Sequence, residues 1–520
     1  MPASTPAPAP EVAEVSAPAR LAAAIDAVAA TDPDRVAMVT AAGLGVDLRR
    51  AVSYGTLAGD VAALERRLAD SRPIGVVARA SEIASLVALV AACGRQRVPL
   101  ALVAEDSRDL VGELRDWSVC GNDLEVSRPP QGRTRREFDS SSPQIVVATS
   151  GTSGPPKLVE HSWDSLLAAA RLAEQWHGRG WILVYDATRW AGTQVWLQAI
   201  LTGGRVIVPA SRDPDCVARA AADENVTILP ATPTLLRRVI ASADSDAVGR
   251  MRLDRITLGG EAADGQLLQQ ARALFPAARV THVYATTELG EVFRVSDGLP
   301  GFPAEWLGRP LPGGAKLSTR RDGELLVQLS RDTAEVATGD VVERRGDRYE
   351  FAGRRSDTIV VGGAKVFPRR VEDVLRAVPG VADARAYGLP NAITGEIVAA
   401  QIVVTDPLPE GVTPENLRAA ALAACRGPSS LTACRASSTS PGSCSRIRRA
   451  RCRVGRSAND QPLPDNDHLR RVPRARLGRR LEIARAGRPD RDVFAIRFGG
   501  TRRPCIAASR PGPSRAARYG

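Results

Sequence analysis

Between residues 20 and 352 the sequence alternates between short apolar stretches rich in β-branched residues and longer amphipathic stretches rich in Ala, Leu and Arg. The short stretches have the length and composition of buried strands, and the longer ones have the apolar period of helices. This alternation is typical of an α/β fold, in which crossover helices connect the strands of a sheet. The clearest predicted strands are 73–77, 144–147, 205–208 and 226–229, and the clearest predicted helices are 57–68 and 267–274.

The pattern changes near residue 320. From 320 to 351, short strand-like segments are separated by Asp-Gly and Gly-Asp turn sequences, which predicts a small β subdomain. After Gly353 the order becomes strand, helix, strand, strand, as in a compact α+β unit that stops near Cys425. We therefore predict a large N-terminal domain (21–352) of stacked α/β subdomains plus a small β subdomain, followed by a small, incomplete α+β C-terminal domain (353–427). The expected elements of the second domain are strand 358–361, helix 369–377, and strands 384–388 and 397–404.

The two ends of the chain differ from these domains. Residues 1–20 are rich in Pro and Ala and lack the features of a secretion signal, so we expect a disordered leader. Residues 428–520 mix Arg, Pro and Ser without a helix or strand period, and we expect an aberrant, disordered tail. The tail holds 22 Arg and 6 Asp/Glu, so the net charge of +12 becomes −4 for residues 1–427. Because the basic surplus carries no motif or interleaved aromatic residues, we expect no nucleic-acid partner.

The tail also suggests a frameshift. GC-rich codons that encode residues 447–455 can be read in a shifted frame as Asp-Pro-Ala-Gly-Lys-Val-Ser-Arg-Arg, and the nucleotide sequence across codons 420–460 would test this hypothesis. No apolar run is long enough to span a bilayer, since the longest, 83–93, is interrupted by Ser85. The cysteines lack metal-ligand spacing, so we expect reduced thiols in a cytoplasmic protein without a membrane partner.

The most informative motif is a glycine-rich run at residues 149–157, Thr-Ser-Gly-Thr-Ser-Gly-Pro-Pro-Lys. It follows the predicted strand 144–147 and precedes a helix expected from about Ser162, so its backbone N–H groups are placed to bind phosphate oxygens. Lys157 would face the leaving phosphates. Pro156 before the lysine and Leu158 after it depart from the P-loop pattern, which disfavours phosphoryl kinases. The simpler alternative is a flexible linker, which seldom places Pro-Pro-Lys behind a buried strand.

This run resembles the signature of the adenylate-forming superfamily of acyl-CoA synthetases, peptide-synthetase adenylation domains and luciferases. Four further segments resemble that family in the same order, and the resemblance covers about residues 20–425, most like a bacterial acid–CoA ligase. The family has a small C-terminal domain that is mobile. The four segments are 258–261 (Leu-Gly-Gly-Glu), 284–288 (Tyr-Ala-Thr-Thr-Glu), 338–340 (Thr-Gly-Asp), and 353–357 (Gly-Arg-Arg-Ser-Asp) with 362–368 and 371–372.

The resemblance implies that a small carboxylic acid reacts with ATP to give an acyl-adenylate and pyrophosphate. A carboxylate is already ionised at pH 7, so its attack needs charge neutralisation and alignment, and no general base. Lys157, Thr287 and Glu288 would be the catalytic residues, with Glu288 also holding Mg²⁺. The implied nucleotide-binding residues are Thr149, Ser150, Gly151, Thr152, Ser153, Gly154, Gly260, Glu261, Tyr284, Asp340 (on the ribose) and Arg354 (near the hinge).

The second half of the implied reaction transfers the acyl group to a thiol. The small domain would rotate about Ser356 and Asp357, and the segment 361–367 would then line a pantetheine channel. We expect CoA as the acceptor. An acyl or peptidyl carrier protein bearing phosphopantetheine is the alternative, favoured if Asp186 binds a substrate amino group, and an unusual acid such as nitrite also stays open.

The acid pocket is less constrained by motifs. Asp186 and Trp190 lie where relatives often line the acid site, although Asp186 fits equally a helix cap and Trp190 a core residue. His161 and His282 lie beside motifs and are interpreted as packing or hydrogen-bonding residues. Ala285 replaces the family's usual glycine, which adds only a methyl group.

The main departure from the family lies at the C-terminus. The resemblance implies a Gly-Lys segment whose lysine bridges the acid and the α-phosphate, but the three lysines are Lys157, Lys316 and Lys365. Loss of such a donor is expected to cost about 3–4 kcal/mol, or roughly a hundred- to thousandfold in the first step. A chain with this sequence should therefore adenylate poorly, and an inactive pseudoenzyme is the non-enzymatic alternative.

Overall fold

The computed structural model describes residues 15–41, 49–79, 81–104, 107, 114, 116–127, 144–149, 156–170, 172–242, 244–330, 333–405, 408–426, 480–485 and 494–499. These residues form two compact units, divided between Thr358 and Ile359. The first is a mixed α/β unit, as the sequence predicted, and the second is a smaller α+β unit. Among the described residues, no helix is both long and apolar enough to cross a membrane.

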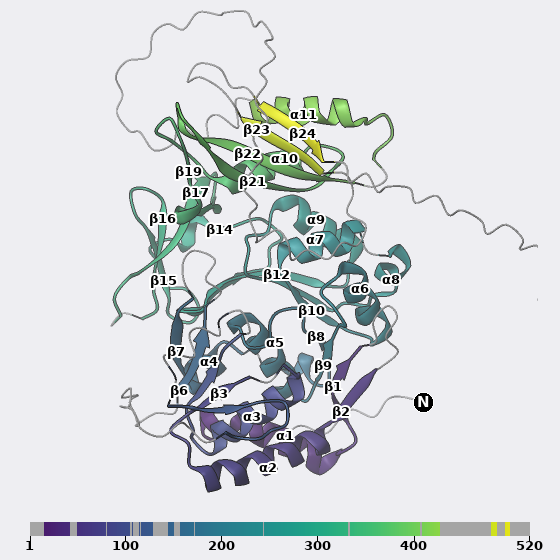
Figure 1. The fold of residues 1–520 in the computed structure, drawn as a ribbon, viewed down its shortest axis with the longest axis vertical. Coiled ribbons are helices and arrows are strands. Elements are labelled where there is room, and N and C mark those ends of the chain that lie inside the picture. The colour runs from purple at the N-terminus through teal and green to yellow at the C-terminus, as the bar shows by residue number, and fades with distance from the viewer. Residues whose placement is uncertain are drawn as a thin grey trace, which may run out of the picture. The chain divides into compact units, whose positions relative to one another are not determined.

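The largest sheet of the first unit is parallel between its two edge strands, which are antiparallel to their neighbours (Figure 1). Parallel strands need crossover connections, and helices supply them between β8, β9, β10, β11 and β12. In spatial order the eight strands are β13 (Gly290–Val295), β12 (Arg279–Thr286), β11 (Arg255–Leu258), β10 (Ile228–Ala231), β8 (Gly180–Ile182), β9 (Arg205–Val208), β1 (Val36–Thr40) and β2 (Arg50–Ser53).

A second sheet of five strands precedes most of these elements in the chain. Its order is β5 (Ser118–Cys120), β3 (Val76–Ala78), β4 (Leu100–Leu102), β6 (Gln144–Ala148) and β7 (Leu158–Ser162). The strands are parallel except for β7, which runs antiparallel to β6. The glycine-rich run therefore connects two paired strands at the edge of this sheet.

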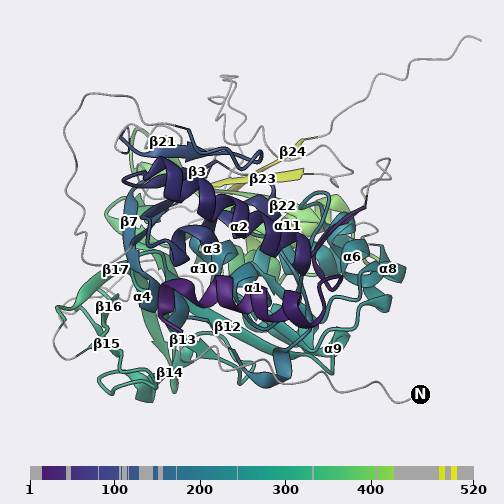
Figure 2. The ribbon, with the colours of Figure 1, turned by 90° about the horizontal axis from the view of Figure 1, so that it is seen from below.

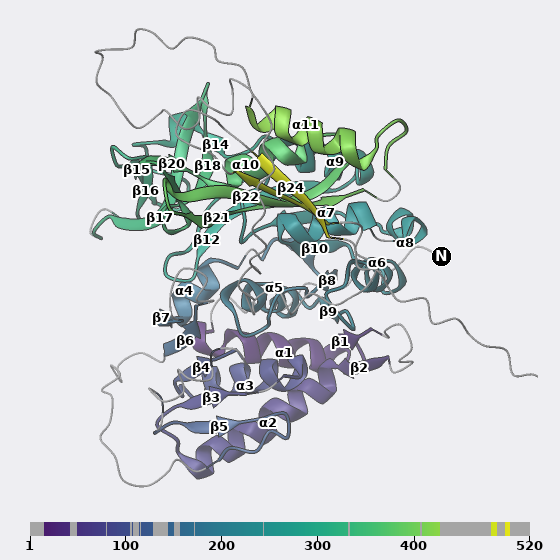
Figure 3. The ribbon, with the colours of Figure 1, turned by 45° about the horizontal axis from the view of Figure 1, so that its top comes forward.

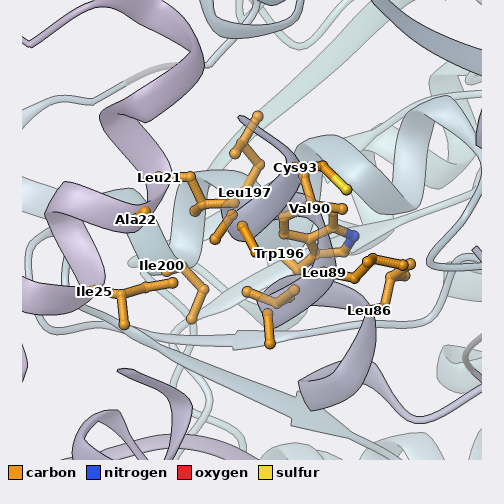
Figure 4. Close-up of a cluster of buried hydrophobic side chains, with 14 of the residues drawn as sticks. Leu21, Ala22, Ile25, Leu86, Leu89, Val90, Cys93, Trp196, Leu197 and Ile200 are labelled. Carbon is orange, nitrogen blue, oxygen red and sulfur yellow. The ribbon is translucent and has the colours of Figure 1, made fainter. Parts of the chain in front are cut away.

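Three helices pack between the two sheets, α1 (Arg20–Thr31), α3 (Ile83–Arg95) and α5 (Trp190–Leu201) (Figure 3). Ten consecutive residues of α3, from Ser85 to Gly94, are buried, as expected for a helix surrounded on all sides. Figure 4 shows side chains of α1 and α3 meeting Trp196, Leu197 and Ile200 of α5. Helix α2 (Tyr54–Ser71) packs on α1 and α3, and Figure 2 shows it from below. Ser53 caps its N-terminus, where the Ser53 hydroxyl accepts a hydrogen bond from the Thr56 N–H.

The opposite face of the large sheet is covered by a second set of helices. Successive strand residues point to opposite faces, so Trp181 and Val206 join the inner core while Ile182 and Ile207 join the outer one. The helices covering this outer face are α6 (Pro214–Asp223), α7 (Pro233–Ser242), α8 (Ser245–Arg250) and α9 (Gly265–Leu274), and α4 (Trp163–Ala168) follows β7.

The predicted small β subdomain is an antiparallel sheet at the end of the first unit. Its core is aromatic, with Phe302 stacked on Tyr349 at 5.7 Å between ring centroids. The strand order is β14 (Phe302–Pro303), β18 (Arg348–Arg354), β17 (Val336–Arg345), β16 (Glu324–Gln328) and β15 (Lys316–Thr319).

The second unit consists of a sheet and two helices. The sheet comprises β20 (Ala364–Val366), β19 (Ile359–Val361), β22 (Gly395–Val404) and β21 (Val381–Asn391), with α10 (Pro368–Arg376) and α11 (Pro414–Arg426). Two strands extend it beyond β22, namely β23 (Arg480–Arg485) and β24 (Phe494–Gly499) (Figures 1 and 2).

The strands β23 and β24 lie in the segment for which we expected no regular structure. Both sequences alternate apolar residues with others, as in Leu481 and Ile483 or Phe494, Ile496 and Phe498. Six residues are enough for such a strand period, although they are too few to stand out in an Arg-rich segment. The rest of 428–520 and the expected leader up to residue 14 lie outside the described residues.

Candidate active site

The glycine-rich run closes a β-hairpin between β6 and β7. At its base, the Thr149 N–H donates to the Lys157 carbonyl at 2.8 Å, and the Lys157 N–H donates to the Thr149 hydroxyl at 2.8 Å. Residues 150–155, including Ser150, Gly151, Thr152, Ser153 and Gly154, lie outside the described residues. The helix expected near Ser162 begins at Trp163, but β7 separates it from the loop. The loop is therefore anchored as a hairpin and does not open directly into a helix.

Arg189 holds the base of this loop from another element. It precedes α5, and its Nη1 donates to the Ala148 carbonyl at 3.3 Å and to the Thr149 carbonyl. Its Nη2 lies 3.3 Å from the Ser107 hydroxyl. Sequence reasoning missed this role, because the only local signal was one charged residue between Asp186 and α5. The contact joins the loop after β8 to the loop after β6.

Trp190, His161 and the turn between β12 and β13 meet beside the loop. The His161 and Trp190 ring centroids are 4.4 Å apart, and a Cβ added to Gly290 would lie 3.2 Å from the Trp190 ring. Burial lowers the pKa of His161, an effect opposed by the Thr287 backbone and the Glu288 carboxylate. Lys157, Thr287 and Glu288 thus come from segments that pack on the same pair of aromatic rings.

Tyr284, Asp340 and Arg354, three of the residues expected to bind nucleotide, form one network. The Tyr284 hydroxyl donates to Asp340 Oδ2 at 2.7 Å, and Arg354 Nε lies 3.3 Å from Asp340 Oδ1. Burial raises the pKa of Asp340, while Tyr284 and Arg354 lower it. The Tyr284 ring is stacked between Phe293 and Phe351, at 5.1 and 5.0 Å between centroids.

The Gly-Gly-Glu segment follows β11 at the same edge of the sheet. Gly260 adopts a φ of 81°, which glycine adopts readily, and the Gly259 carbonyl accepts from the Tyr185 hydroxyl at 3.3 Å. Glu261 Oε2 accepts from the Thr234 N–H at 3.1 Å and from its hydroxyl at 2.5 Å. This carboxylate stabilises the start of α7, so a contact of Glu261 with nucleotide stays a prediction.

Glu288 is the candidate Mg²⁺ ligand. It is exposed in the turn after β12, and within the described residues its carboxylate makes no hydrogen bond or ion pair. The described residues contain no group of three or more His, Cys, Asp or Glu side chains that could hold a metal. A single carboxylate still fits Mg²⁺, because this ion commonly takes one or two carboxylates together with substrate phosphates and water.

The family model described as AMP-binding enzyme matches residues 59–326, which is more than half of the chain. The chain belongs to this family. It is 27% identical over 299 residues to a 2-succinylbenzoate–CoA ligase of Bacillus licheniformis, covering 51% of this chain and 61% of the relative. It is 28% identical over 289 residues to the medium/long-chain-fatty-acid–CoA ligase FadD8 of Mycobacterium tuberculosis, covering 50% of this chain and 51% of the relative. The chain thus spans between half and two thirds of these relatives.

Solved structures of adenylate-forming enzymes share the fold. The amide bond synthetase McbA from Marinactinospora thermotolerans superimposes with a TM-score of 0.56 at 24% identity, covering 78% of this chain and 92% of that one. ATP-bound MatB from Rhodopseudomonas palustris gives a TM-score of 0.54 at 19% identity, covering 75% and 89%. The predicted fold class and the resemblance to this superfamily are confirmed.

For this AMP-binding enzyme, the structure separates the two residues expected to line the acid pocket. Asp186 Oδ1 accepts from the Thr188 N–H at 2.9 Å and from its hydroxyl at 2.6 Å, a local cap before α5. Asp186 also lines a cavity of about 820 Å³, whereas Trp190 packs on His161 and does not line it. Their contact with substrate stays a prediction.

The expected hinge lies at the boundary between the two units. Ser356 and Asp357 are exposed in a single 3₁₀ turn, where the Ser356 hydroxyl donates to Asp357 Oδ1 at 2.8 Å. The segment expected to line a pantetheine channel is a tight hairpin of β19 and β20, with Gly362 and Gly363 at φ of 56° and 85°. Rotation at the hinge and the channel remain predictions.

Proposed function

We propose that this chain activates a carboxylic acid with ATP, forming an acyl-adenylate and pyrophosphate, and then transfers the acyl group to the thiol of CoA. The observation that carries the proposal is the Tyr284–Asp340–Arg354 network in a member of the AMP-binding enzyme family. The reaction class is supported by relatives that are acid–CoA ligases by name.

The side chains of the candidate site suit a reaction that needs neutralisation of phosphate charge more than proton transfer. Each Asp340 oxygen has one partner in the network and keeps a lone pair for a ribose hydroxyl. Lys157 is exposed at the base of the loop, where its ammonium would neutralise phosphate charge while the ionised carboxylate attacks. Thr287 would contact the α-phosphate, and Glu288 would hold Mg²⁺, which supplies Lewis-acid stabilisation of the phosphates.

ATP–pyrophosphate exchange with a panel of aliphatic, aromatic, amino and inorganic acids tests the first step. We expect one class of acid to raise exchange above the acid-free background. The matched control is Lys316→Ala, because Lys316 is an exposed lysine on β15 outside the motifs. Exchange that is independent of every acid would contradict the proposal.

The first step is expected to be slow in this chain. The last lysine, Lys365, lies on β20, and the family resemblance implies a further lysine near the end of the small domain. Restoring the hypothesised reading frame should raise exchange by roughly a hundred- to thousandfold, the effect of one charge-stabilising donor. No exchange by either version would leave only the non-catalytic alternative.

A carrier protein is the second candidate acceptor. It is favoured by the similarity to phenyloxazoline synthase MbtB of Mycolicibacterium paratuberculosis, which is 28% identical over 333 residues, or 52% of this chain and 26% of that protein. Offering CoA and phosphopantetheinylated carrier proteins to the acyl-adenylate separates the two acceptors. We place the protein in the cytoplasm, and among the described residues Cys93 and Cys120 are buried thiols that form no disulfide.

A further inference from the structure

A cavity of about 820 Å³ lies in the first unit at the carboxyl ends of two pairs of parallel strands, β3 and β4 in one sheet and β8 and β9 in the other. Its walls include the segments that directly follow β3, β4, β8 and β9, and the edge strand β2 closes it. Ligands of α/β proteins commonly bind outside the carboxyl ends of strands, and this volume suits a small molecule. Apolar side chains supply much of the lining, including Met38, Val52, Ile83, Val103, Leu183 and Val208.

Three arginines line this cavity: Arg50, Arg79 and Arg212. Arg50 pairs with Glu82 at 3.5 Å. Arg79 and Arg212 are exposed and have no hydrogen bond or ion pair from their side chains within the described part of the chain. The N-terminus of α3 also faces the cavity through Ile83 and Ala84, which adds a partial positive charge.

Within the described residues, neither Arg79 nor Arg212 forms an ion pair with an acidic residue of the lining. Glu82 is the partner of Arg50, and one oxygen of Asp186 is held by Thr188. The cavity therefore offers two guanidinium groups to a ligand, and guanidinium binds carboxylate or phosphate with paired hydrogen bonds.

The cavity shares a wall with the candidate active site. Residues 185–188 line it, and the next residue, Arg189, holds the base of the glycine-rich loop. Tyr185 further bonds to Gly259 beside the Gly-Gly-Glu motif. A molecule in the cavity would lie next to the loop on which the first step depends.

We propose that this cavity binds an extended ligand with an apolar body and an anionic end, and that Arg79 and Arg212 bind the anion. The inference rests on the proposed function for the identity of the ligand. The anion is either the second carboxylate of a dicarboxylic acid substrate or a phosphate of the CoA thiol. Both sources present the same chemistry to the two arginines.

Equilibrium binding by titration calorimetry tests the proposal with two matched pairs of probes. CoA is compared with pantetheine, and adipate with hexanoate, on the full chain. In one pair, the member that carries the additional anionic group (CoA or adipate) should bind more tightly than its partner, whose corresponding end is a neutral group (pantetheine) or a methyl group (hexanoate). Arg79→Gln and Arg212→Gln should each weaken that binding about tenfold, which corresponds to about 1.4 kcal/mol, and should leave its neutral-ended partner unchanged. Dependence of CoA on the arginines identifies the phosphate source, and dependence of adipate identifies the carboxylate source.

Two further variants control for folding and for general charge. Arg66→Gln removes an exposed arginine of α2 that does not line the cavity, and it should bind the probes as the wild type does. Ala51→Trp, at an exposed edge position of the lining, should exclude the ligand while Arg79 and Arg212 are kept. Equal binding by the wild type and both glutamine variants, or no binding of any probe, would overturn the proposal.

The binding assay also separates this inference from the proposed function. If a probe binds in a way that depends on the two arginines but no acid stimulates ATP–pyrophosphate exchange, the anion site is supported and the proposed ligase activity is contradicted. If an acid stimulates ATP–pyrophosphate exchange but the binding of no probe depends on the arginines, the ligase activity is supported and the anion site is contradicted.

Discussion

The two ends of the candidate nucleotide site are held in different ways. At the ribose end, Tyr284 and Asp340 are bonded to each other, and the Tyr284 ring is stacked between two phenylalanines. At the phosphate end, Lys157 and Glu288 are exposed, and their charged groups make no hydrogen bond or ion pair within the described residues. The expected ribose end is therefore preorganised by the fold, whereas under the proposed function the expected phosphate end would obtain its partners from ATP. Substitutions should therefore affect folding and binding together at the first end, and mainly catalysis at the second.

The largest effect is expected for Lys157→Ala. Removing a charge that stabilises the phosphates should lower acid-dependent exchange by roughly a hundred- to thousandfold. The melting temperature should stay within about 2 °C, because exposed substitutions seldom change stability by more than about 0.5 kcal/mol. Exchange and thermal unfolding are measured on the same preparations, with Lys316→Ala as the control. A large drop in melting temperature would show that the two ends do not differ as described.

Tyr284→Phe tests the ribose end. It keeps the stacked ring and removes the hydroxyl that donates to Asp340, so the stability should fall by about 1 kcal/mol. We also expect the KM for ATP to rise about tenfold, because Asp340 loses the contact that orients it. Tyr349→Phe is the matched control, since Tyr349 is stacked on Phe302 and packs on the same hydrophobic cluster as Tyr284. An unchanged KM for ATP together with an unchanged unfolding curve would contradict the inference that the Tyr284–Asp340 contact preorganises the ribose end.

Gly290→Ala tests the turn that carries Glu288. Gly290 has a φ of 69°, and a left-handed conformation costs a residue with a Cβ about 1–2 kcal/mol. The added Cβ would also lie 3.2 Å from Trp190. In Gly346→Ala the φ of 62° is similar, but nothing lies within 4 Å of the new Cβ. Urea unfolding should show a greater loss of unfolding free energy for Gly290→Ala than for Gly346→Ala. Equal losses would show that the Trp190 side chain moves away from the added Cβ at no measurable cost.

The smallest effect is a pH dependence at His282 on β12. Burial lowers the pKa of His282 from 6.5, so the unfolded state binds its proton more readily than the folded state. The stability that depends on neutral His282 is complete above about pH 6.5 and is lost as the pH falls through that value towards the lower folded pKa. His282→Gln keeps a donor for the Leu299 carbonyl, which lies 3.0 Å from Nε2. Its unfolding free energy should vary less between pH 7.5 and 5.5 than that of the wild type, and an identical slope would contradict the assignment.

The alternation of strands and helices predicted much of the first unit. The expected strand 205–208 is β9, and the expected helix 267–274 lies within α9, because both carry strong local periods. The motifs also brought together Tyr284 and Asp340, which are 56 residues apart in the chain. The family resemblance had assigned both residues to one nucleotide site, which stays a prediction, whereas a local period carries no information on contacts so far apart in the chain.

Contacts that arise only from packing could not be predicted. Arg189, in the loop after β8 of the large sheet, donates to the Thr149 carbonyl in the loop after β6 of the second sheet. The residues around Arg189 in the sequence do not identify that partner. The contact of the Glu261 carboxylate with Thr234 of α7 likewise had no signal in the sequence, and the nucleotide contact of Glu261 stays a prediction. The strands β23 and β24 escaped notice because six residues of alternating period are common by chance in a biased composition.

The Arg189 contact has a consequence for attempts to redesign acid preference. Residues 185–188 line the cavity. The next residue, Arg189, donates a hydrogen bond to the Ala148 carbonyl at the base of the glycine-rich loop. A library that varies this wall would change the residues that directly precede that anchor in the chain. Arg189 Nη2 also lies 3.3 Å from the Ser107 hydroxyl, and the Ser107 N–H donates to the Ala104 carbonyl, so the lining around Val103 is joined to the same anchor. Selections for new substrates should therefore hold Arg189 and Trp190 fixed, and mutate the lining around Val52 of β2 and Ile83 of α3.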